Sequence, residues 1–284
     1  MKCKWAVLVS PVLAAALLCG CVPVQVMGSM MDLGSFVVSV QQVLEEGTVE
    51  DLPAESRSAV AMERLTYTAG GSISNVEVEE KDASVQLCTG PVDRVTVEYS
   101  QPAGSQLYTF AERGGTLIVK KERETKGSRH SEEQSTVITL PEKTYGSIRV
   151  ETENGSIRAD GLEAESFSAD TNNGSVEAKG VTARDLELES GNGSFRLSGV
   201  KAGRLEVQGV NGSVVLDGAE AEAFTCRLTN GSITGSLAGR EEDCSITASA
   251  GFGRNNLRSA QRPGAEKSLD FRVENGGIQV RFLG

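Results

Sequence analysis

From about residue 141 onward, apolar and polar residues alternate along the chain, and the alternation repeats with a fixed period of 19. Apolar or small residues recur six and four positions before a shared Asn, and three, five and eight positions after it. Alternation of this kind predicts strands with one buried face. A fixed repeat of about 20 residues is typical of a solenoid, in which each repeat forms one coil.

The shared Asn opens the tripeptide Asn-Gly-Ser in five repeats, and one further Asn-Gly follows after a gap. These asparagines are Asn154, Asn173, Asn192, Asn211, Asn230 and Asn275. We predict that Asn-Gly forms one corner of each coil by supplying the positive φ of a tight turn, and that the stacked Asn side chains form a hydrogen-bonded ladder. A second glycine column marks the other corner: Gly161, Gly180, Gly199 and Gly218.

Each coil therefore holds two short strands, and the strands of successive coils would stack in parallel about 4.8 Å apart. Because so short a repeat leaves little room for a third side, we predict an all-β, single-stranded β-helix that is flattened into two sheets. One coil buries too little apolar surface to stand alone, so neighbouring coils should fold together. One of the predicted inward columns is Ile148, Phe167, Leu186, Leu205 and Phe224.

The pattern predicts one β-helical domain over residues 64–284, with degenerate coils over 64–140 and regular coils over 141–284. After Asn230, the residues from Cys244 to Ala248 fit the inward columns of the next coil. Residues 269–280 fit the last coil. Between these two coils, residues 254–267 are polar and contain Pro and Gly, so we expect a loop that bulges from one corner.

Cys226 and Cys244 occupy inward positions of coils that the sequence order makes adjacent. A disulfide is one interpretation in an oxidising compartment. Two small buried hydrophobic side chains are the other, and we favour it.

Residues 1–20 read as an export signal, with Lys2 and Lys4 before an apolar stretch that is short for a membrane span. The end of this stretch, Leu-Cys-Gly-Cys, resembles the bacterial lipobox. That resemblance implies cleavage before Cys21 and lipidation of Cys21, which would anchor the protein to the membrane. An uncleaved anchor and ordinary secretion are the alternatives. Residues 21–63 would then be a tether, with a short element that covers the first coil.

The net charge limits the classes of molecule that the protein is expected to bind. The 284 residues carry 39 acids and 28 bases, a net charge of −11. This balance disfavours nucleic acid and anionic lipid surfaces as partners. The 32 glycines and 5% aromatic residues fit a turn-rich β protein.

A lipobox-like start, a degenerate β region and Asn-Gly-Ser corners followed by Ile or Val resemble the bacterial putative-adhesin family of unknown function, a toastrack-type β-helix. The resemblance covers residues 64–284. It implies a cell-envelope location and roles in surface binding or envelope sensing. It supplies no catalytic residues, because none is established for the family.

Candidate chemistry is sparse. Asn-Gly-Ser is formally a glycosylation acceptor, but its register with a corner column favours a structural role. Acids stack on outward faces, with Glu151, Asp170 and Glu189 in one column and Glu187 and Glu206 in another. Without basic or aromatic companions they indicate a solvated wall rather than a catalytic pair.

Other catalytic and binding residues are scarce. His130, the only histidine, lies in a charged loop over residues 120–135, which is a poor place for a catalytic base. No metal site or cofactor is predicted, because no Asp column or Cys/His spacing is present. The four tyrosines are the only platforms for sugar stacking: Tyr67, Tyr99, Tyr108 and Tyr145.

We therefore expect a non-enzymatic, envelope-anchored β-helix that binds an unknown protein or surface polymer, serves as a scaffold or senses the envelope. The alternative from another class is an extracellular polysaccharide lyase or hydrolase, because large β-helices also carry such enzymes and fold does not decide function. A signalling ectodomain is a third hypothesis.

Overall fold

The computed structural model describes residues 61–122 and 135–284. The predicted signal, Cys21 and nearly all of the predicted tether lie outside these residues. The described chain is built from strands and one short 3-10 turn at Glu241–Asp243. The strands are β1 (Met62–Thr68), β2 (Asn75–Glu79), β3 (Ser84–Gly90), β4 (Thr96–Pro102), β5 (Tyr108–Arg113), β6 (Thr116–Lys121), β7 (Ser135–Pro141), β8 (Thr144–Thr152), β9 (Ile157–Asp160), β10 (Glu163–Thr171), β11 (Val176–Lys179), β12 (Thr182–Asn192), β13 (Phe195–Ser198), β14 (Lys201–Asn211), β15 (Val214–Asn230), β16 (Ile233–Leu237), β17 (Cys244–Ala250), β18 (Lys267–Asn275) and β19 (Ile278–Phe282).

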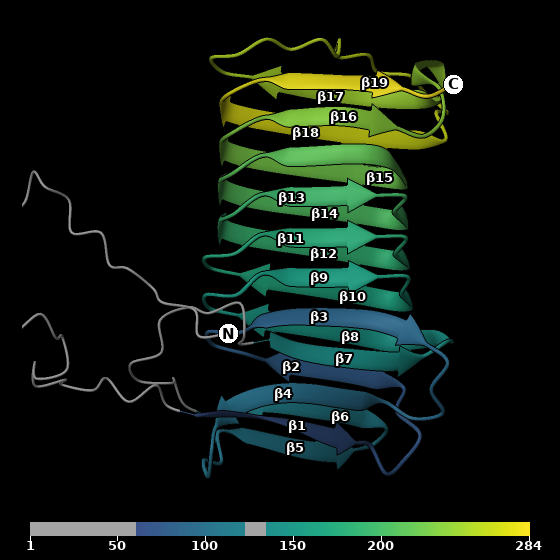
Figure 1. Cartoon of the computed structure of the whole chain (residues 1–284). Helices are drawn as coiled ribbons and strands as arrows, with labels where there is room; N and C mark the ends of the chain where they lie inside the picture. The colour runs from purple at the N-terminus through teal and green to yellow at the C-terminus, as the bar shows by residue number, and fades with distance from the viewer. Residues whose placement is uncertain (1–60, 123–134) are drawn as a thin grey trace, which may run out of the picture. The chain divides into compact units, whose positions relative to one another are not determined.

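Two sheets face each other along the stack (Figure 1). Sheet A runs in the order β1-β4-β7-β3-β9-β11-β13-β15-β16-β19. Sheet B runs in the order β5-β6-β2-β8-β10-β12-β14-β15-β18-β17. Strand β15 belongs to both sheets because it continues through the second corner: its first residues pair with β13 and its later residues with β14.

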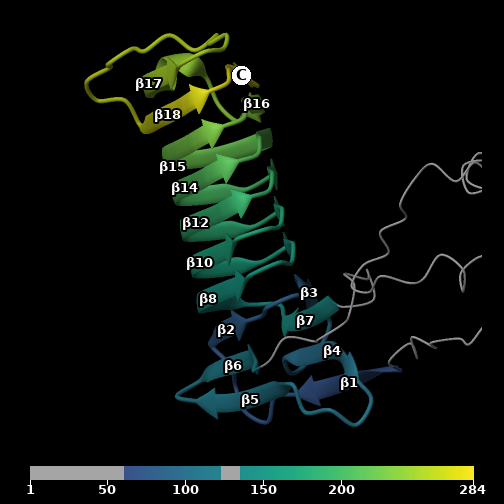
Figure 2. The ribbon, with the colours of Figure 1, turned by 90° about the vertical axis from the view of Figure 1, so that its left-hand side faces the viewer.

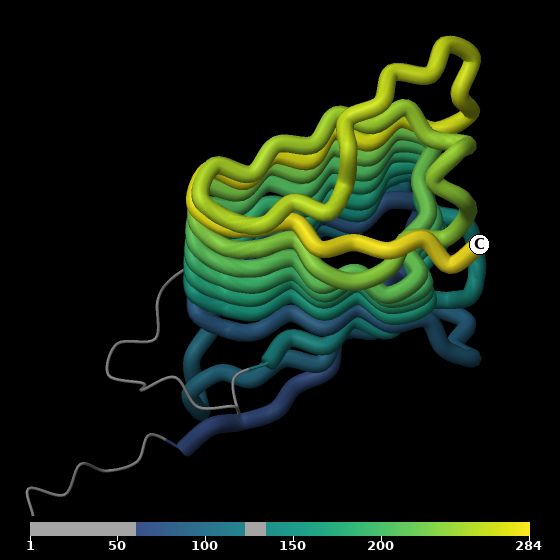
Figure 3. The backbone as a smooth tube through the Cα atoms, turned by 90° about the horizontal axis from the view of Figure 1, so that it is seen from above, coloured from purple at the N-terminus to yellow at the C-terminus, as the bar shows by residue number. Residues whose placement is uncertain are grey.

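The regular coils stack in parallel, with each residue beside its counterpart in the next repeat, so Phe167 lies beside Leu186 and Leu186 beside Leu205. The column that begins at Ile148 and ends at Phe224 is at most 1% exposed throughout. Seen along the stack, the coils superimpose as flattened loops with two long sides (Figure 3). The predicted all-β, two-sheet β-helix with two short strands per coil is confirmed.

Two coils are stacked out of chain order. The β2–β3 coil lies between β6 and β8 in sheet B and between β7 and β9 in sheet A. At the other end, β18 lies between β15 and β17. The prediction that the coil containing Cys244 follows directly on the coil of Asn230 is therefore wrong. Both candidate coils have suitable apolar columns, but only the later one carries Asn275, which continues the corner hydrogen bonds from Asn230.

The two cysteines are separated by this arrangement. Cys226 pairs in register with Phe271 of β18, and Cys244 lies one strand further away, on β17. Both thiols are free and buried, as the interpretation of two small buried hydrophobic side chains predicts. Burial raises the pKa of both thiols above the ordinary value.

The N-terminal end of the stack departs from the degenerate coils expected over 64–140. Strand β4 is antiparallel to both β1 and β7, and β5 is antiparallel to β6 (Figure 2). The rings of Tyr67 on β1 and Phe110 on β5 stack at 4.3 Å between centroids, and Tyr99 packs against Phe110 at 5.1 Å. Aromatic side chains from the two sheets therefore meet and close the core at this end.

The C-terminal end is closed by the chain between β17 and β18, which the sequence pattern assigned to a bulging loop. The Asn256 side chain donates to the carbonyl of Val280 at 2.7 Å and accepts from its N–H at 2.9 Å. Leu257 is buried, and Ala260 exchanges two 2.8 Å backbone hydrogen bonds with Ile246. This segment satisfies backbone groups on the edges of both sheets, as a solenoid end requires.

The Asn-Gly corners use glycine chiefly for close approach between coils, and the predicted positive φ is found at only some of them. No Asn in the described residues has a positive φ, and Gly155, Gly174 and Gly193 have none either, whereas Gly212, Gly231 and Gly276 have φ of +152°, +148° and +153°. A Cβ on Gly193 would lie 1.8 Å from the carbonyl oxygen of Gly174, because successive corners approach that closely. The second glycine column does use positive φ, with φ +59° at Gly180 and +58° at Gly199.

Candidate binding surface

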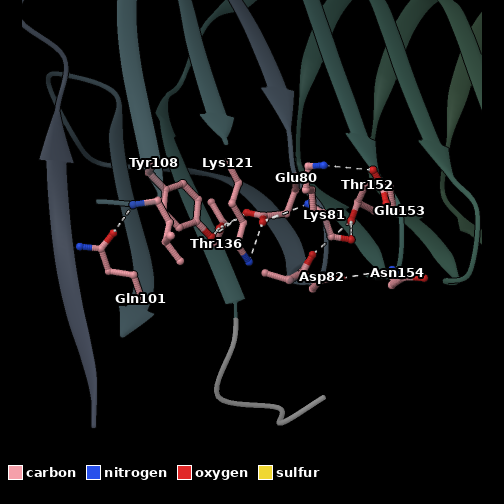
Figure 4. Close-up of polar contacts among 12 residues, drawn as sticks. Glu80, Lys81, Asp82, Gln101, Tyr108, Lys121, Thr136, Thr152, Glu153 and Asn154 are labelled. Carbon is pink, nitrogen blue, oxygen red and sulfur yellow. Dashed lines mark hydrogen bonds and ion pairs between the residues drawn. The ribbon is translucent and has the colours of Figure 1, made fainter. Parts of the chain in front are cut away.

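The asparagines of the corners form a continuous side-chain ladder. Each Nδ2 donates to the Oδ1 of the Asn in the preceding coil, at 2.8–3.0 Å, from Asn173 through to Asn275. At the N-terminal end of the ladder, Asn154 donates to the carboxylate of Asp82 at 3.2 Å (Figure 4). A carboxylate suits this position because it only has to accept.

The serines form a second row beside the ladder. The backbone N–H of Ser175 donates to the Oγ of Ser156, and the pattern continues at 3.2–3.3 Å through Ser194, Ser213 and Ser232. Every residue of the tripeptide thus has a structural task. The corner edge accounts for Asn-Gly-Ser without a bound ligand.

A degenerate copy of this corner is present that the repeat pattern of the sequence did not predict. Asp82, Ala83 and Ser84 stand where the regular coils carry Asn, Gly and Ser, and Ser84 Oγ accepts the N–H of Ser156 at 3.3 Å. Val76 and Val78 occupy the two inward columns that precede it, and both are buried. The long stretch of chain between Asp82 and Asn154 hides this copy, because it breaks the regular period.

Carboxylates gather on the outer face of sheet B. Glu151 lies beside Asp170, and Asp170 beside Glu189, on successive strands. In the neighbouring column Glu187 lies beside Glu206. We call these five residues the acidic face.

The acids at the centre of this face lack direct partners. Within the described ranges, no cation lies within salt-bridge distance of Asp170, Glu187 or Glu189. Glu151 pairs with Arg149, and Glu206 pairs with Arg204 at 2.9 Å. The acidic face thus has direct ion pairs at its two ends and none in the middle, where the charge of Arg149 only partly offsets the rise in the pKa of Asp170.

The environment of the face raises two carboxyl pKa values. Desolvation, followed by the charge of Glu151, raises the pKa of Asp170. Desolvation, followed by the charges of Asp170, Glu187 and Glu206, raises the pKa of Glu189. Each group is harder to ionise in the folded chain because it is partly desolvated and because like charges lie on adjacent strands.

A hollow of about 400 Å³ adjoins the acidic face at its N-terminal end. Its lining is almost wholly charged or polar: Glu79, Glu80, Lys81, Lys120, Lys121, Glu122, Glu151, Thr152, Glu153, Asp170 and Asn172. The cations are already paired, with Lys120 at 2.7 Å from Glu79 and Lys81 at 3.6 Å from Glu153. The hollow thus offers no unpaired cation of its own to an anionic ligand.

One ion pair beneath this hollow is fully buried. Lys121 lies 3.2 Å from Glu80, and the two side chains are 1% and 0% exposed. Tyr108 and Thr136 donate to the other oxygen of Glu80, at 2.8 and 2.9 Å (Figure 4). This network joins Glu80, the residue that follows β2, to the consecutive strands β5, β6 and β7, which lie later in the chain. Sequence reasoning missed it, because Lys121 falls in the predicted charged loop and pairs with a residue much earlier in the chain.

The tyrosines do not form exposed platforms. Tyr145 is buried, and its hydroxyl donates to the carbonyl of Pro141. At the N-terminal end, Tyr67 and Tyr99 pack against Phe110, and Tyr99 also packs against Tyr108. Tyr108 is buried and Tyr67 and Tyr99 are half-buried, so the three rings contribute to the closed end of the core.

Few groups suited to catalysis come together. His130 lies outside the described residues. In the part of the chain that the structure covers, no three His, Cys, Asp or Glu side chains are placed to hold a metal ion. That part also contains no helix of sufficient length and apolar character to cross a membrane.

Comparison with known proteins gives a family match over most of the chain. The family described as Toastrack DUF4097 matches residues 73–282. None of the curated proteins matches the chain.

Several solved structures are similar to this chain at low sequence identity. A putative adhesin from Bacteroides fragilis NCTC 9343 is 14% identical, with 78% of this chain and 97% of that chain covered and a TM-score of 0.47. A putative cell adhesion protein from Clostridium sporogenes ATCC 15579 is 12% identical, with coverage of 78% and 100% and a TM-score of 0.38. A putative lipid binding protein from Parabacteroides distasonis ATCC 8503 is 13% identical, with coverage of 78% and 97% and a TM-score of 0.42.

Proposed function

The chain belongs to the Toastrack DUF4097 family, and from this premise we propose that it is a non-enzymatic, envelope-anchored protein that binds a cationic partner surface through its acidic face. The partner is a protein or a surface polymer. Such binding would attach the protein to a surface, hold an assembly together as a scaffold, or let the protein sense the state of the envelope.

The acidic face is the observation that carries this proposal. Asp170 and Glu189 lie on adjacent strands of a rigid sheet, and their negative charges repel each other. Charges that destabilise the folded chain and lack local partners are typical of sites kept for function. A cationic surface would relieve the repulsion on binding, which supports sheet B as the contact face.

The anchor is the second part of the proposal. The basic start, the apolar stretch and the lipobox-like end support lipidation of Cys21. Mass spectrometry of the mature protein tests it. We expect an N-terminal Cys21 that carries lipid, and an unmodified terminus further along the chain would contradict the anchor.

Binding is tested by incubating intact envelopes with a full-length C21A variant, which cannot be lipidated at this position. We expect the variant to be retained on envelopes at low salt and released as the salt concentration rises, because salt screens contacts between exposed charges. Retention that does not change with salt would contradict binding through the acidic face.

The alternative function is a polysaccharide lyase or hydrolase. The same preparation, incubated with a panel of polysaccharides, distinguishes it. Turnover that persists in the purified chain would overturn the non-enzymatic proposal. We expect no new reducing ends and no unsaturated products.

A further inference from the structure

The asparagine ladder has one incompletely held end. From Asn154 to Asn230, every side chain both donates through Nδ2 and accepts through Oδ1. Asn275 donates to Asn230 at 3.0 Å, but among the described residues nothing donates to its own Oδ1. It is the last member of the ladder.

The reason lies in the next coil of the stack. Ala250 of β17 pairs with Val273, and Asn255 bridges to Ile278, so Phe252 occupies the position that corresponds to Asn275. The Phe252 side chain has no donor and is 89% exposed. The ladder stops at Asn275 because the following corner lacks an amide.

The backbone of this corner is also less restrained. The N–H groups of Gly193, Gly212 and Gly231 each donate to the carbonyl of the Asn in the next coil, at 2.9–3.0 Å. Within the described ranges, the N–H of Gly276 makes no such bond, and neither do those of Gly155 and Gly174. Both the side chain and the following amide are thus freer at Asn275 than at those three corners.

An Asn followed by Gly is chemically labile, because glycine has no Cβ to hinder attack by its own backbone nitrogen. That nitrogen loses its proton to solvent and bonds to the Cγ of Asn, and Nδ2 leaves as ammonia. Water then opens the five-membered imide at either carbonyl and gives aspartate or isoaspartate. The net reaction consumes one water and releases one ammonia.

We propose that Asn275 is the site at which the folded chain deamidates, ahead of the five other Asn-Gly corners. Attack requires the Asn side chain to turn toward the next nitrogen. At Asn275 this breaks one ladder hydrogen bond, whereas at Asn173 or Asn192 it breaks two. One hydrogen bond fewer corresponds to a rate roughly two- to tenfold higher.

The product weakens the end of the stack. An aspartate at 275 cannot donate to the Oδ1 of Asn230, so two oxygens face each other across the corner. Isoaspartate adds a methylene to the backbone between β18 and β19 and shifts their register. The modification would therefore loosen the β18–β19 coil, which supports β17 and the segment between β17 and β18 that closes the C-terminal end.

The test is a time course of the folded, full-length protein at mildly alkaline pH, followed by peptide mapping with mass spectrometry. We expect deamidation at Asn275 two- to tenfold faster than at Asn173 or Asn192. In the same protein unfolded in urea, the six sites should react at similar rates. Equal rates at Asn275 and Asn192 in the folded chain would overturn the proposal.

Two variants at position 252 test whether the end of the asparagine ladder, rather than another feature of this corner, causes the fast deamidation of Asn275. F252N supplies an amide donor for Asn275 Oδ1, so we expect Asn275 to slow to the rate of the inner corners and the labile site to move to position 252. F252A removes the ring without adding a donor, so the deamidation rate of Asn275 should stay as high as in the unmodified chain. If F252N folds, as judged by circular dichroism, and Asn275 stays as fast as before, the ladder does not control the reaction.

Discussion

Each residue of the Asn-Gly-Ser corner performs a separate task that depends on the coil next to it. The Asn amide bonds along the stack, the Ser hydroxyl accepts the next backbone N–H, and the Gly leaves room for a carbonyl oxygen. For Gly193 that oxygen belongs to Gly174, at a distance that no Cβ tolerates. The corner is therefore specified chiefly by contacts between coils, and a positive φ is an additional requirement at Gly212, Gly231 and Gly276.

The glycine columns give a direct comparison. G193A places a Cβ 1.8 Å from a carbonyl oxygen, so we expect a loss of about 3 kcal/mol or more of unfolding free energy. G199A, at φ +58° with nothing within 4 Å of the added Cβ, should cost only about 1–2 kcal/mol through the left-handed conformation. Urea unfolding of both variants measures the difference. Equal costs would show that close approach does not explain the first column.

The sequence predicted the columns well and the role of the corner glycine only in part. Inward positions such as Phe167 and Leu205 follow from local alternation, which requires no knowledge of the neighbouring coil. The approach of Gly193 to Gly174 depends on how tightly two coils stack, and no local pattern records that distance. The corner role of Asp82 could not be predicted for a related reason: Asp82 is recognisable as the counterpart of a corner Asn only once its hydrogen-bond partner, Asn154, is known.

At the scale of strands, the chain places the β2–β3 coil and the β18–β19 coil between strands that are distant in sequence. Interchangeable apolar columns could not reveal this order. Buried polar groups help to specify it: Glu80, the residue that follows β2, binds Lys121 at the end of β6 and Thr136 on β7. We interpret this network as a device that selects the inserted position of β2–β3.

The buried pair can be tested by a double-mutant cycle. E80Q leaves the ammonium of Lys121 buried without its counter-ion, and we expect a loss of about 3–5 kcal/mol in unfolding free energy. Adding K121M removes the stranded charge and should recover part of that loss. Chemical denaturation measures all variants. A double variant as unstable as the sum of the two single variants would show that the pair is not coupled.

The N-terminal end has a pH-dependent contact. The Glu112 carboxylate accepts from the Tyr67 hydroxyl at 2.7 Å and from the N–H groups of Gly70 and Gly71 at 2.7 and 2.9 Å. The first of these bonds is the main cause that lowers the pKa of Glu112. A lowered carboxyl pKa contributes stability above the unfolded value of about 4.5, and this stability is lost as the pH falls through the folded value.

We therefore expect the amides of Gly70 and Gly71 to lose protection from hydrogen exchange on acidification, relative to an E112Q variant at each pH. In the same variant the pKa of Tyr67, which burial and then Glu112 raise to about 12, should move down toward 10. Spectrophotometric titration of tyrosinate follows this change. An unchanged pKa of Tyr67 would contradict the contact.

At the scale of the whole molecule, a rigid stack displays the acidic face on one wall of the β-helix. The regular coils hold Asp170 and Glu189 in fixed register, so their repulsion is built into the fold. The sequence predicted that these acids share a column, because they stand one full repeat apart. It could not show that the centre of the face lacks counter-ions, since the pairs that form depend on side-chain reach across strands.

Repulsion on the acidic face should be measurable as stability. A raised carboxyl pKa means that the protonated form favours folding, so this contribution is present below the unfolded pKa and is lost as the pH rises through the folded pKa. D170N and E189Q should each raise the unfolding free energy at neutral pH by about 0.3–0.5 kcal/mol and have no effect at strongly acidic pH. A loss of stability at neutral pH would contradict the assigned repulsion.

The most direct test of the account is equilibrium binding of the full-length C21A protein to intact envelopes, with and without the acidic face. The test variant neutralises Glu151, Asp170 and Glu189 as E151Q, D170N and E189Q. The matched control neutralises three acids on the outer face of sheet A, as D160N, E177Q and D217N, and changes the net charge equally.

If the acidic face is the contact surface, the sheet B variant should bind at least about tenfold more weakly, a loss of about 1.4 kcal/mol, and the sheet A control should bind with little change. Equal affinities for the two variants would contradict binding through the acidic face.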